Sequence, residues 1–308
     1  MKPETINNHT ILISPLNWGM GHVARCIPLI HQFLLQNNRV IVACDEDQKK
    51  IFHNYFPEIE YENHKGYPFK FNGKGNFGSD LFKSGFKLIK RLKLEKIEVR
   101  NILEKYNVDI VISDHRYGFF TKKCKSIFIT HQINLPVSWH SKVIDRIHKK
   151  LIQAFDIIWI LDTPDSKFAG KLSVNNIFKN AEFIGPRSRF SIYKKEEKIY
   201  RTVVVISGPN PYSHQFFEQQ LILAQKNSSK TIFIVPKQFS IKNNVEQIEI
   251  IESIDWKKSD YILLRAQKII SRSGYSTIMD LEFLKTENEL FPTKGQKEQE
   301  YLYELFEK

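Results

Sequence analysis

The chain has 308 residues, of which 42% are hydrophobic and 13% aromatic, a composition typical of globular domains and not of disordered chains. No apolar run approaches the roughly 20 residues needed to cross a bilayer, and the polar N-terminus lacks the apolar region of a signal peptide. We therefore expect a cytoplasmic protein. The three cysteines Cys26, Cys44 and Cys124 show neither metal spacing nor even pairing, which predicts reduced thiols.

The first half of the chain predicts alternating strands and helices. Residues 17–21 predict a turn, and a helix follows to about residue 35. Helical patterns also separate the later apolar runs. This alternation is typical of βαβ units around a parallel sheet. The short apolar runs that predict buried strands are 10–14, 39–44, 109–113, 126–130 and 157–161.

Residues 82–100 predict a basic amphipathic helix. Its aromatic and aliphatic residues share one face and its lysines another: Phe82, Phe86, Ile89 and Leu92 against Lys83, Lys87, Lys90 and Lys93. The usual arrangement for such a pattern packs the apolar stripe in the core, and that is what we expect. The alternative is a helix that lies on an anionic membrane. The preceding Gly-rich segment, 64–80, predicts a loop.

The second half predicts another α/β series after a charged linker at 190–201. Strands are expected at 202–207, 231–235, 261–264, 268–271 and 289–291, and a last helix from residue 297 to the end. We therefore predict two doubly wound domains, 1–188 and 189–308, that face each other across a cleft.

The positive charge is concentrated in the first half. Residues 1–150 hold 24 Lys and Arg against 14 Asp and Glu, a balance of +10, whereas residues 201–308 hold 14 of each. A basic face suits anionic lipid, nucleic acid or a phosphorylated acceptor, or it is simply a solvated surface. Most aromatic residues lie in apolar runs and are not interleaved with the Lys clusters, so we do not expect a nucleic-acid partner.

The segment 269–281 predicts a phosphate site. An apolar strand leads into Ser271-Arg272-Ser273-Gly274, and a helix begins directly afterwards. Backbone N–H groups, hydroxyls and the positive end of the helix dipole then converge on one spot, which suits a phosphate or diphosphate. Asp280 follows within two turns, where its carboxylate can accept hydrogen bonds from ribose hydroxyls. A nucleotide diphosphate site is therefore expected here.

Three motifs in order resemble the GT-B glycosyltransferases of family 28, the family of the lipid II-forming N-acetylglucosaminyltransferase. They are the Ser271–Gly274 turn, the loop and helix at 292–301, and the Gly-rich loop 18–28. The resemblance implies a nucleotide-sugar donor site in the second domain and an acceptor site in the first. It implies that the following residues bind the donor: Ser207, Gly208, Ser273, Gly274, Ser276, Thr277, Asp280, Gln299 and Glu300. Glu300 stands where the family usually has a second Gln, and Pro209 makes the 207–210 loop less Gly-rich than the family pattern.

His22 is the candidate base. It follows the Gly19–Gly21 turn at a helix start, where the helix dipole lowers the pKa of a histidine and keeps it able to accept a proton. The alternative is a helix-capping or solvated histidine. Residues at expected strand ends face the ligand crevice of such sheets, either as acceptor contacts or as internal hydrogen-bonding groups. The acceptor candidates are Gly19, Gly21, Asp114, Arg116 and His131.

These observations predict an inverting, metal-independent glycosyltransferase without a cofactor. It would move a sugar, with a UDP-sugar as the expected donor, to the hydroxyl of a sugar or lipid-linked acceptor, at the inner face of the membrane if the basic half docks there. No Asp-x-Asp cluster is present to hold a divalent ion. The alternatives are a nucleotide-sugar 2-epimerase, which Glu300 keeps open, and a non-enzymatic protein that binds nucleotide sugar or nucleic acid.

Overall fold

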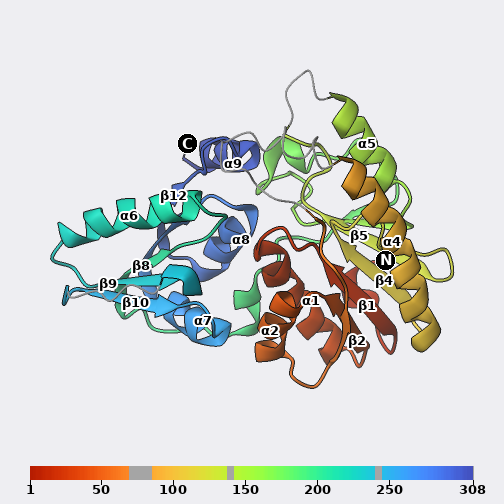
Figure 1. Cartoon of the computed structure of the whole chain (residues 1–308), viewed down its shortest axis with the longest axis horizontal. Coiled ribbons are helices and arrows are strands. Elements are labelled where there is room, and N and C mark those ends of the chain that lie inside the picture. Colours follow the sequence, from red (N-terminus) through yellow and green to blue (C-terminus); the bar gives the residue numbers. More distant parts are fainter. Residues whose placement is uncertain (69–84, 137–141, 240–244, 308) are drawn as a thin grey trace. The chain divides into compact units, whose positions relative to one another are not determined.

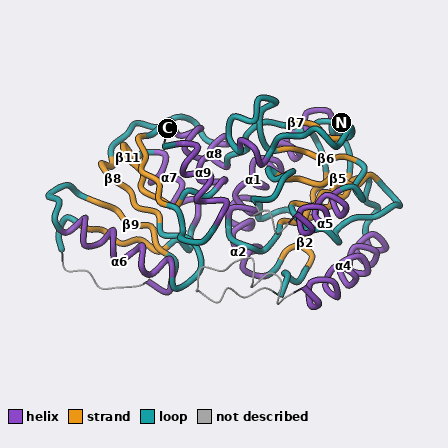
Figure 2. The backbone as a smooth tube through the Cα atoms, turned by 90° about the horizontal axis from the view of Figure 1, so that it is seen from above, coloured by secondary structure: helices purple, strands orange, loops and turns teal. Residues whose placement is uncertain are grey.

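The computed structural model describes residues 1–68, 85–136, 142–239 and 245–307. These residues form two compact units (Figure 1): unit 1 includes the described residues up to Arg189, and unit 2 includes those from Phe190 onwards. Within each unit, strands alternate with helices along the chain (Figure 2). The prediction of two doubly wound α/β units is confirmed.

Unit 1 contains one sheet in the order β3-β2-β1-β4-β5-β6-β7, and every neighbouring pair runs parallel. Strands β1, β2, β4 and β5 are almost wholly buried, as expected for strands covered on both faces. The strands are β1 (Thr10–Pro15), β2 (Arg39–Cys44), β3 (Glu60–Asn63), β4 (Ile110–Asp114), β5 (Lys125–Thr130), β6 (Ile157–Ile160) and β7 (Ala181–Phe183).

Helices connect these strands. Helix α1 buries most of its length against the sheet, and α2 begins at a capping box in which Asp45 and Gln48 satisfy each other's backbone N–H groups. The helices of unit 1 are α1 (Gly21–Leu35), α2 (Glu46–Tyr55), α4 (Gly85–Lys105) and α5 (Lys142–Ile152), with short 3-10 helices η1 (Pro3–Thr5) and η3 (Gly170–Leu172). None of the described helices is long and apolar enough to cross a membrane.

The expected orientation of the basic helix is wrong at Ile89, whereas Leu92 of the same predicted stripe is half-buried. Ile89 is 57% exposed, and Leu94 and Ile97 are also on the surface. The face of α4 that turns inward carries Arg91 and Glu95, followed by the apolar residues Val99 and Ile102. The first part of the predicted helix, 82–84, lies outside the described residues.

A buried ionic network explains that orientation. Glu95 is fully buried, and its carboxylate accepts hydrogen bonds from Arg116 Nε at 2.6 Å, Tyr67 Oη at 2.7 Å and Gly118 N at 3.0 Å. Burial raises the pKa of Glu95, but hydrogen bonds and charge from His64 and Arg116 outweigh burial and leave that pKa below its ordinary value. Satisfying these polar groups takes the inner face of the middle of α4 and leaves Ile89, Leu94 and Ile97 outside.

Unit 2 contains a second parallel sheet in the order β10-β9-β8-β11-β12. Helix α6 lies on one side of strands β8 and β9 and α7 on the other (Figures 1 and 2). The elements are η4 (Arg189–Ile192), β8 (Tyr200–Val205), α6 (Tyr212–Gln225), β9 (Thr231–Val235), η5 (Lys237–Phe239), β10 (Ile248–Glu252), α7 (Trp256–Leu264), β11 (Ala266–Arg272), α8 (Tyr275–Leu284), β12 (Glu287–Phe291) and α9 (Lys297–Phe306).

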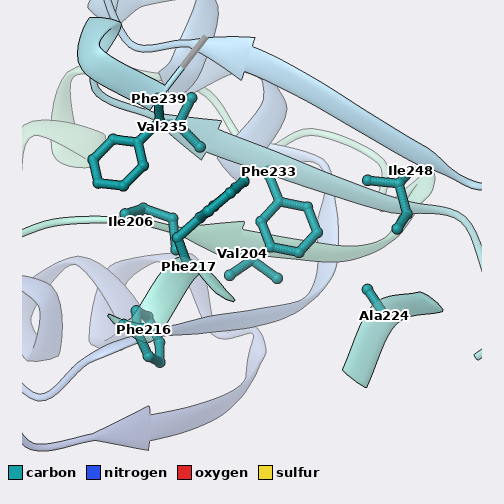
Figure 3. Close-up of a cluster of buried hydrophobic side chains, with 9 residues drawn as sticks. All are labelled: Val204, Ile206, Phe216, Phe217, Ala224, Phe233, Val235, Phe239 and Ile248. Atoms are coloured by element: carbon teal, nitrogen blue, oxygen red, sulfur yellow. The ribbon is translucent and has the colours of Figure 1, made fainter. Parts of the chain in front are cut away.

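The core of unit 2 holds α6 against the sheet. Phe216 and Phe217 of α6 pack with Val204 and Phe233 of the strands and with Phe239 (Figure 3). The rings of Phe217 and Phe233 meet edge to face, with centroids 5.6 Å apart, a favourable aromatic geometry. This packing fixes the loop between β8 and α6 at the carboxyl edge of the sheet.

Several expected boundaries need correction. Residues 261–264 form the end of α7 and not a strand, since Asp255 caps that helix by accepting a hydrogen bond from the Lys258 N–H. The expected linker 190–201 contains most of η4 and the start of β8. Strands β3, β7 and β10 were not expected from the sequence, because they are short and largely half-exposed at or near sheet edges.

Candidate functional site

The first candidate site lies at the point in the sheet of unit 1 where the order of the strands reverses. Strands β1 and β4 are parallel neighbours, with Pro15 opposite Asp114. From β1 the chain proceeds to β2 and β3 on one side, and from β4 it proceeds to β5, β6 and β7 on the other. Connections that leave in opposite directions open a crevice at the carboxyl ends of the two strands, which is the usual ligand position in such sheets.

The loop after β1 is shaped by glycine and braced from the side. Gly19 has φ +87°, a left-handed conformation that other residues adopt only with strain, and it is exposed. Asn17 Oδ1 accepts a hydrogen bond from the Tyr67 N–H at 2.9 Å, and a Cβ on Gly66 would clash with the Asn17 side chain. The loop therefore delivers Gly21 and the first turn of α1 to the crevice in a fixed position.

His22 and Asp114 meet in this crevice. His22 Nδ1 lies 3.0 Å from Asp114 Oδ2, and the side chains are 14% and 0% exposed. Arg25, one turn later on α1, binds the same carboxylate through Nε at 2.9 Å and through Nη2. A fork of this kind is a strong, directional way to hold a buried carboxylate.

These contacts shift both pKa values downward. Burial raises the pKa of Asp114, but the charges of Arg25 and His22 outweigh burial and lower that pKa to about 2. Burial and the Arg25 charge lower the pKa of His22, although Asp114 opposes them. Near neutral pH the pair therefore consists of an ionised carboxylate and a neutral imidazole, which is the state that a general base requires.

Two further histidines lie beside the pair. His131, at the end of β5, places Nδ1 3.0 Å from Arg25 Nη1. His115 follows Asp114 in a left-handed conformation with φ 59°, and its Nε2 lies 2.7 Å from Thr130 Oγ1. The ring centroids of His22 and His115 are 5.5 Å apart. The described crevice thus gathers imidazoles around one buried carboxylate.

Arg116 occupies a different position from the one expected. It is fully buried, and its guanidinium contacts the Glu95 carboxylate and the backbone oxygens of Pro15 and Lys65. The ion pair faces the interior next to α4. These contacts assign Arg116 a role in joining α4 to the strand ends, at odds with the expected acceptor contact.

The second candidate site lies at the corresponding position of unit 2. Strands β8 and β11 are parallel neighbours whose connections proceed to opposite sides of the sheet. Ser207 and Gly208 follow β8, and Gly208 has φ +97° and is exposed. Ser273 and Gly274 follow β11 and begin α8. The sheet therefore brings the two predicted phosphate-facing loops together at one carboxyl edge.

The turn before α8 is fixed by hydrogen bonds to its neighbours. Ser273 is fully buried, and its hydroxyl donates to the Gln299 backbone oxygen at 2.9 Å. Gly274 is the N-cap of α8 and supplies no side-chain cap. Ser276 and Thr277 lie in the first turn, and Asp280 lies one turn further on, all of them half-buried.

Arg272 was not among the expected site residues. Its guanidinium donates to the backbone oxygens of Pro292 at 2.9 Å and Tyr212 at 3.0 Å, and it lies 4.2 Å from the centroid of the Phe216 ring. Burial lowers its pKa to about 10. Within the described parts of the chain, no carboxylate lies within ion-pair distance of Arg272. A partly buried cation without a counter-ion beside a helix N-terminus favours an anionic ligand.

Gln299 and Glu300, which were predicted to bind the donor, also organise their own loop. Gln299 Oε1 accepts a hydrogen bond from the Thr293 N–H at 2.9 Å, and Glu300 Oε1 accepts one from the Gly295 N–H at 2.7 Å. Lys297 Nζ lies 3.0 Å from the other oxygen of Glu300. Both side chains therefore stiffen the loop between β12 and α9, and both remain half-exposed.

Arg25 and Arg272 are the residues that sequence reasoning missed. Arg25 lies three residues after His22, a spacing that places the two side chains on the same helix face. Arg272 lies within the quoted turn motif. Helical spacing was therefore a usable signal for Arg25, whereas the lack of a counter-ion at Arg272 needs the folded structure. The described residues contain no group of three or more His, Cys, Asp or Glu side chains placed to hold a metal ion.

No protein-family model matches the sequence, and no curated protein matches it either. Solved structures do match along almost the whole chain. The glycotransferase of kitacinnamycin gives a TM-score of 0.68 at 13% identity, over 97% of this chain and 84% of that one. Spinosyn rhamnosyltransferase complexed with thymidine diphosphate gives 0.64 at 10% identity, over 96% and 84%. The UDP-GlcNAc 2-epimerase from Neisseria meningitidis bound to UDP-GlcNAc gives 0.58 at 13% identity, over 97% and 91%.

At these identities the likeness establishes the fold. The chain has the GT-B fold of two Rossmann-like units, in agreement with the predicted fold class.

The buried state of Asp114 predicts an acid-dependent loss of stability. A carboxyl whose folded pKa is about 2, against an ordinary 3.8, stabilises the fold above the ordinary value, and that contribution is lost as the pH falls through about 2. The free-energy gap between wild type and Asp114→Asn, measured by urea unfolding, should shrink by about 2 kcal/mol between pH 5 and pH 2.5.

The matched control is Asp47→Asn, since the Asp47 side chain is 80% exposed. That variant should differ little from wild type at either pH. A gap for Asp114→Asn that is equal at both pH values would contradict the assignment of an ionised, stabilising Asp114.

Proposed function

We propose that the chain is an inverting glycosyltransferase that moves a sugar from a nucleotide diphosphate donor, a UDP-sugar, to an acceptor hydroxyl. The observation that carries this proposal is the His22–Asp114 pair at the strand reversal of unit 1. A neutral imidazole held by a buried carboxylate suits removal of a hydroxyl proton. The GT-B fold supports the same reaction class, since several solved neighbours with this fold are glycosyltransferases.

The reaction then runs as a single displacement. The acceptor oxygen attacks the anomeric carbon while the bond from that carbon to the donor phosphate oxygen breaks. His22 takes the acceptor proton, and the Asp114 carboxylate stabilises the imidazolium that forms. The nucleoside diphosphate leaves with the electron pair of the broken bond, and attack from the opposite side inverts the anomeric configuration.

The second predicted domain, residues 189–308, which contains the described residues of unit 2, is the proposed donor-binding part. The turn at Ser273 and Gly274, with Ser207 and Gly208 opposite, would receive the diphosphate. Charge that develops on the leaving phosphate oxygens would be stabilised by the N-terminus of α8 and by Arg272. No metal is required where helix dipole and guanidinium supply that positive potential. Residues proposed for the remaining donor contacts are Ser276, Thr277, Asp280, Gln299 and Glu300, with Asp280 toward the ribose.

The first predicted domain, residues 1–188, which covers most of unit 1, is the proposed acceptor-binding part. Gly19, Gly21 and His131 border the His22–Asp114 pair and are the proposed acceptor contacts. Asp114 is proposed to hold His22 and not to contact the acceptor directly, since its carboxylate is fully buried against that histidine. We also propose that the chain is a family 28 enzyme with a lipid-linked acceptor. This more specific proposal rests on the motifs at Ser271–Gly274, 292–301 and 18–28.

The anionic inner face of the membrane is a proposed partner of unit 1. Helix α4 exposes Ile89, Leu94 and Ile97, and the lysines between them are exposed as well. On the next helix, α5, Val143 and Ile147 are more than half exposed. Aliphatic side chains interleaved with lysines suit the boundary between lipid headgroups and acyl chains.

A second candidate function is nucleotide-sugar 2-epimerisation. It is favoured by the likeness to the solved UDP-GlcNAc 2-epimerase from Neisseria meningitidis bound to UDP-GlcNAc. Epimerisation needs groups that remove and return a proton on the sugar ring itself. Glu300 is the carboxylate nearest to that role, but it binds Gly295 N and Lys297 within its own loop. We therefore place transfer first.

The base role of His22 is tested by His22→Ala. Turnover should fall by roughly 10²–10⁴, while UDP affinity stays unchanged because His22 lies outside the donor unit. The assay is release of UDP from a UDP-sugar, with UDP affinity from calorimetry. His53→Ala, at an exposed histidine of unit 1, is the control and should retain full turnover. Wild-type turnover in His22→Ala would return His22 to a structural role.

The donor role of Arg272 is tested by Arg272→Met, which keeps the apolar contact to Phe216 and removes the charge. UDP affinity should fall about tenfold to a hundredfold, since a hydrogen bond to a charged group contributes roughly 1.5–3 kcal/mol. Arg265→Met removes a cation already paired with Glu196 and is the matched control in the same unit. Equal UDP affinity in wild type and Arg272→Met, measured by calorimetry, would remove Arg272 from the donor site.

Membrane docking is tested by reversing Lys90, Lys93 and Lys96 to Glu. Each lysine near an anionic surface contributes about 1 kcal/mol, so sedimentation with phosphatidylserine vesicles should be lost at low salt. Reversal of Lys226, Lys257 and Lys258 in unit 2 is the control with the same change of net charge. If wild-type protein shows no preference for anionic over neutral vesicles, the surface of α4 serves another purpose.

A further inference from the structure

Arg25 makes an unusual set of contacts for a residue inside a helix. It lies on α1 one turn after His22, and its side chain is 3% exposed. Its Nε and Nη2 bind the two oxygens of Asp114, and Nη1 lies 3.0 Å from His131 Nδ1. The remaining contact is to the proposed base: Nη2 lies 2.7 Å from His22 Nδ1.

His22 Nδ1 therefore has two partners that make opposite demands. If Nδ1 carries a proton, it can donate to Asp114 Oδ2 at 3.0 Å, but it then meets the N–H of Arg25 Nη2 at 2.7 Å. If Nδ1 is bare, it accepts from Arg25. A guanidinium never gives up its protons in a protein, so Arg25 can only donate.

The closer contact decides between these arrangements. Two nitrogens 2.7 Å apart share a hydrogen, because two N–H groups at that separation repel each other. The hydrogen belongs to Nη2, which favours Nδ1 as the acceptor. The opposing approach of Nδ1 to Asp114 Oδ2 is longer, and the Asp114 charge is already compensated by the Arg25 fork.

We propose that Arg25 is a positioning residue that sets the tautomer of His22, donating from Nη2 to His22 Nδ1 and leaving the imidazole proton on Nε2 in the free protein. Its consequence for catalysis rests on the proposed function of His22 as base. In this tautomer Nε2 has no lone pair to offer. Base competence then requires Nη2 to withdraw, Nδ1 to take a proton from solvent and donate it in a hydrogen bond to Asp114, and Nε2 to release its own proton to solvent.

The charged and titratable groups that the structure describes around the ring come from three elements. Helix α1 contributes Arg25 and Cys26, the end of β4 contributes Asp114 and His115, and the end of β5 contributes His131. Burial lowers the pKa of His115 far below its ordinary value, so this neighbour adds no positive charge near neutral pH. Among these described groups, Arg25 and Asp114 are the two that contact Nδ1.

The test is nitrogen NMR of the full chain with isotope-labelled histidine at pH 7.5. Long-range proton–nitrogen correlations separate a protonated ring nitrogen from a bare one, and His22→Gln identifies the signals. The expected result is a bare Nδ1 and a protonated Nε2 in His22 of wild-type protein. A protonated Nδ1 in wild type overturns the proposal, without the need for any further variant.

Two variants separate Arg25 from Asp114 as the controlling group. Asp114→Asn keeps the donor at Nη2, so Nδ1 should stay bare. Arg25→Lys keeps the positive charge but loses the fork, so the Nδ1 signal should shift to the protonated range. A change of tautomer in Asp114→Asn, with none in Arg25→Lys, would assign control to Asp114 and refute the proposal.

The result of this NMR test does not depend on the proposed activity. A bare Nδ1 together with full turnover in His22→Ala would sustain the role of Arg25 and refute the base. A protonated Nδ1 together with lost turnover in His22→Ala would do the opposite.

Discussion

The burial of one carboxylate constrains the whole of unit 1. Asp114 ends a central strand with no exposure to solvent, and an uncompensated charge there would cost several kcal/mol. The carboxylate therefore needs Arg25 from α1, and α1 must start close to the end of β1 to deliver it. That requirement fixes the 17–21 loop, which is also the loop that brings His22 to the same carboxylate. The interaction that keeps the fold stable thus builds the candidate site.

The same topological constraint produces the second site. In both units the strand order reverses between two neighbouring strands, β1 and β4 in unit 1 and β8 and β11 in unit 2. Loops that are distant in sequence therefore converge at one edge of each sheet. In unit 1 the convergence assembles His22, Arg25 and Asp114, a set of groups that suits proton transfer. In unit 2 it assembles small residues, a helix N-terminus and Arg272, which suit a diphosphate. One architecture therefore supports two different kinds of chemistry through the side chains that follow the strands.

Strand ends with strong apolar runs could be predicted from the sequence, and they placed His22, Asp114 and Ser273 correctly at carboxyl edges. The interior face of α4 could not be predicted from the sequence, because the ionic network around Glu95 overrides the apolar period of the helix. Arg116 was predicted to contact the acceptor because its ion-pair partner, Glu95, is distant in sequence and the pairing appears only in the folded structure. Residues 261–264 have the β-branched and apolar character of a strand, yet the Asp255 cap makes them the end of α7.

In the proposed function, the groups of both units take part in the transfer of a sugar from a nucleotide donor. Its most direct test is product analysis by proton and phosphorus NMR, in heavy water, with UDP- and TDP-sugars and a panel of acceptor sugars. The account predicts release of the nucleoside diphosphate and a product whose anomeric configuration is inverted, without deuterium on the sugar carbons. A sugar epimerised at C2 that carries solvent deuterium, with no acceptor product formed, would contradict it.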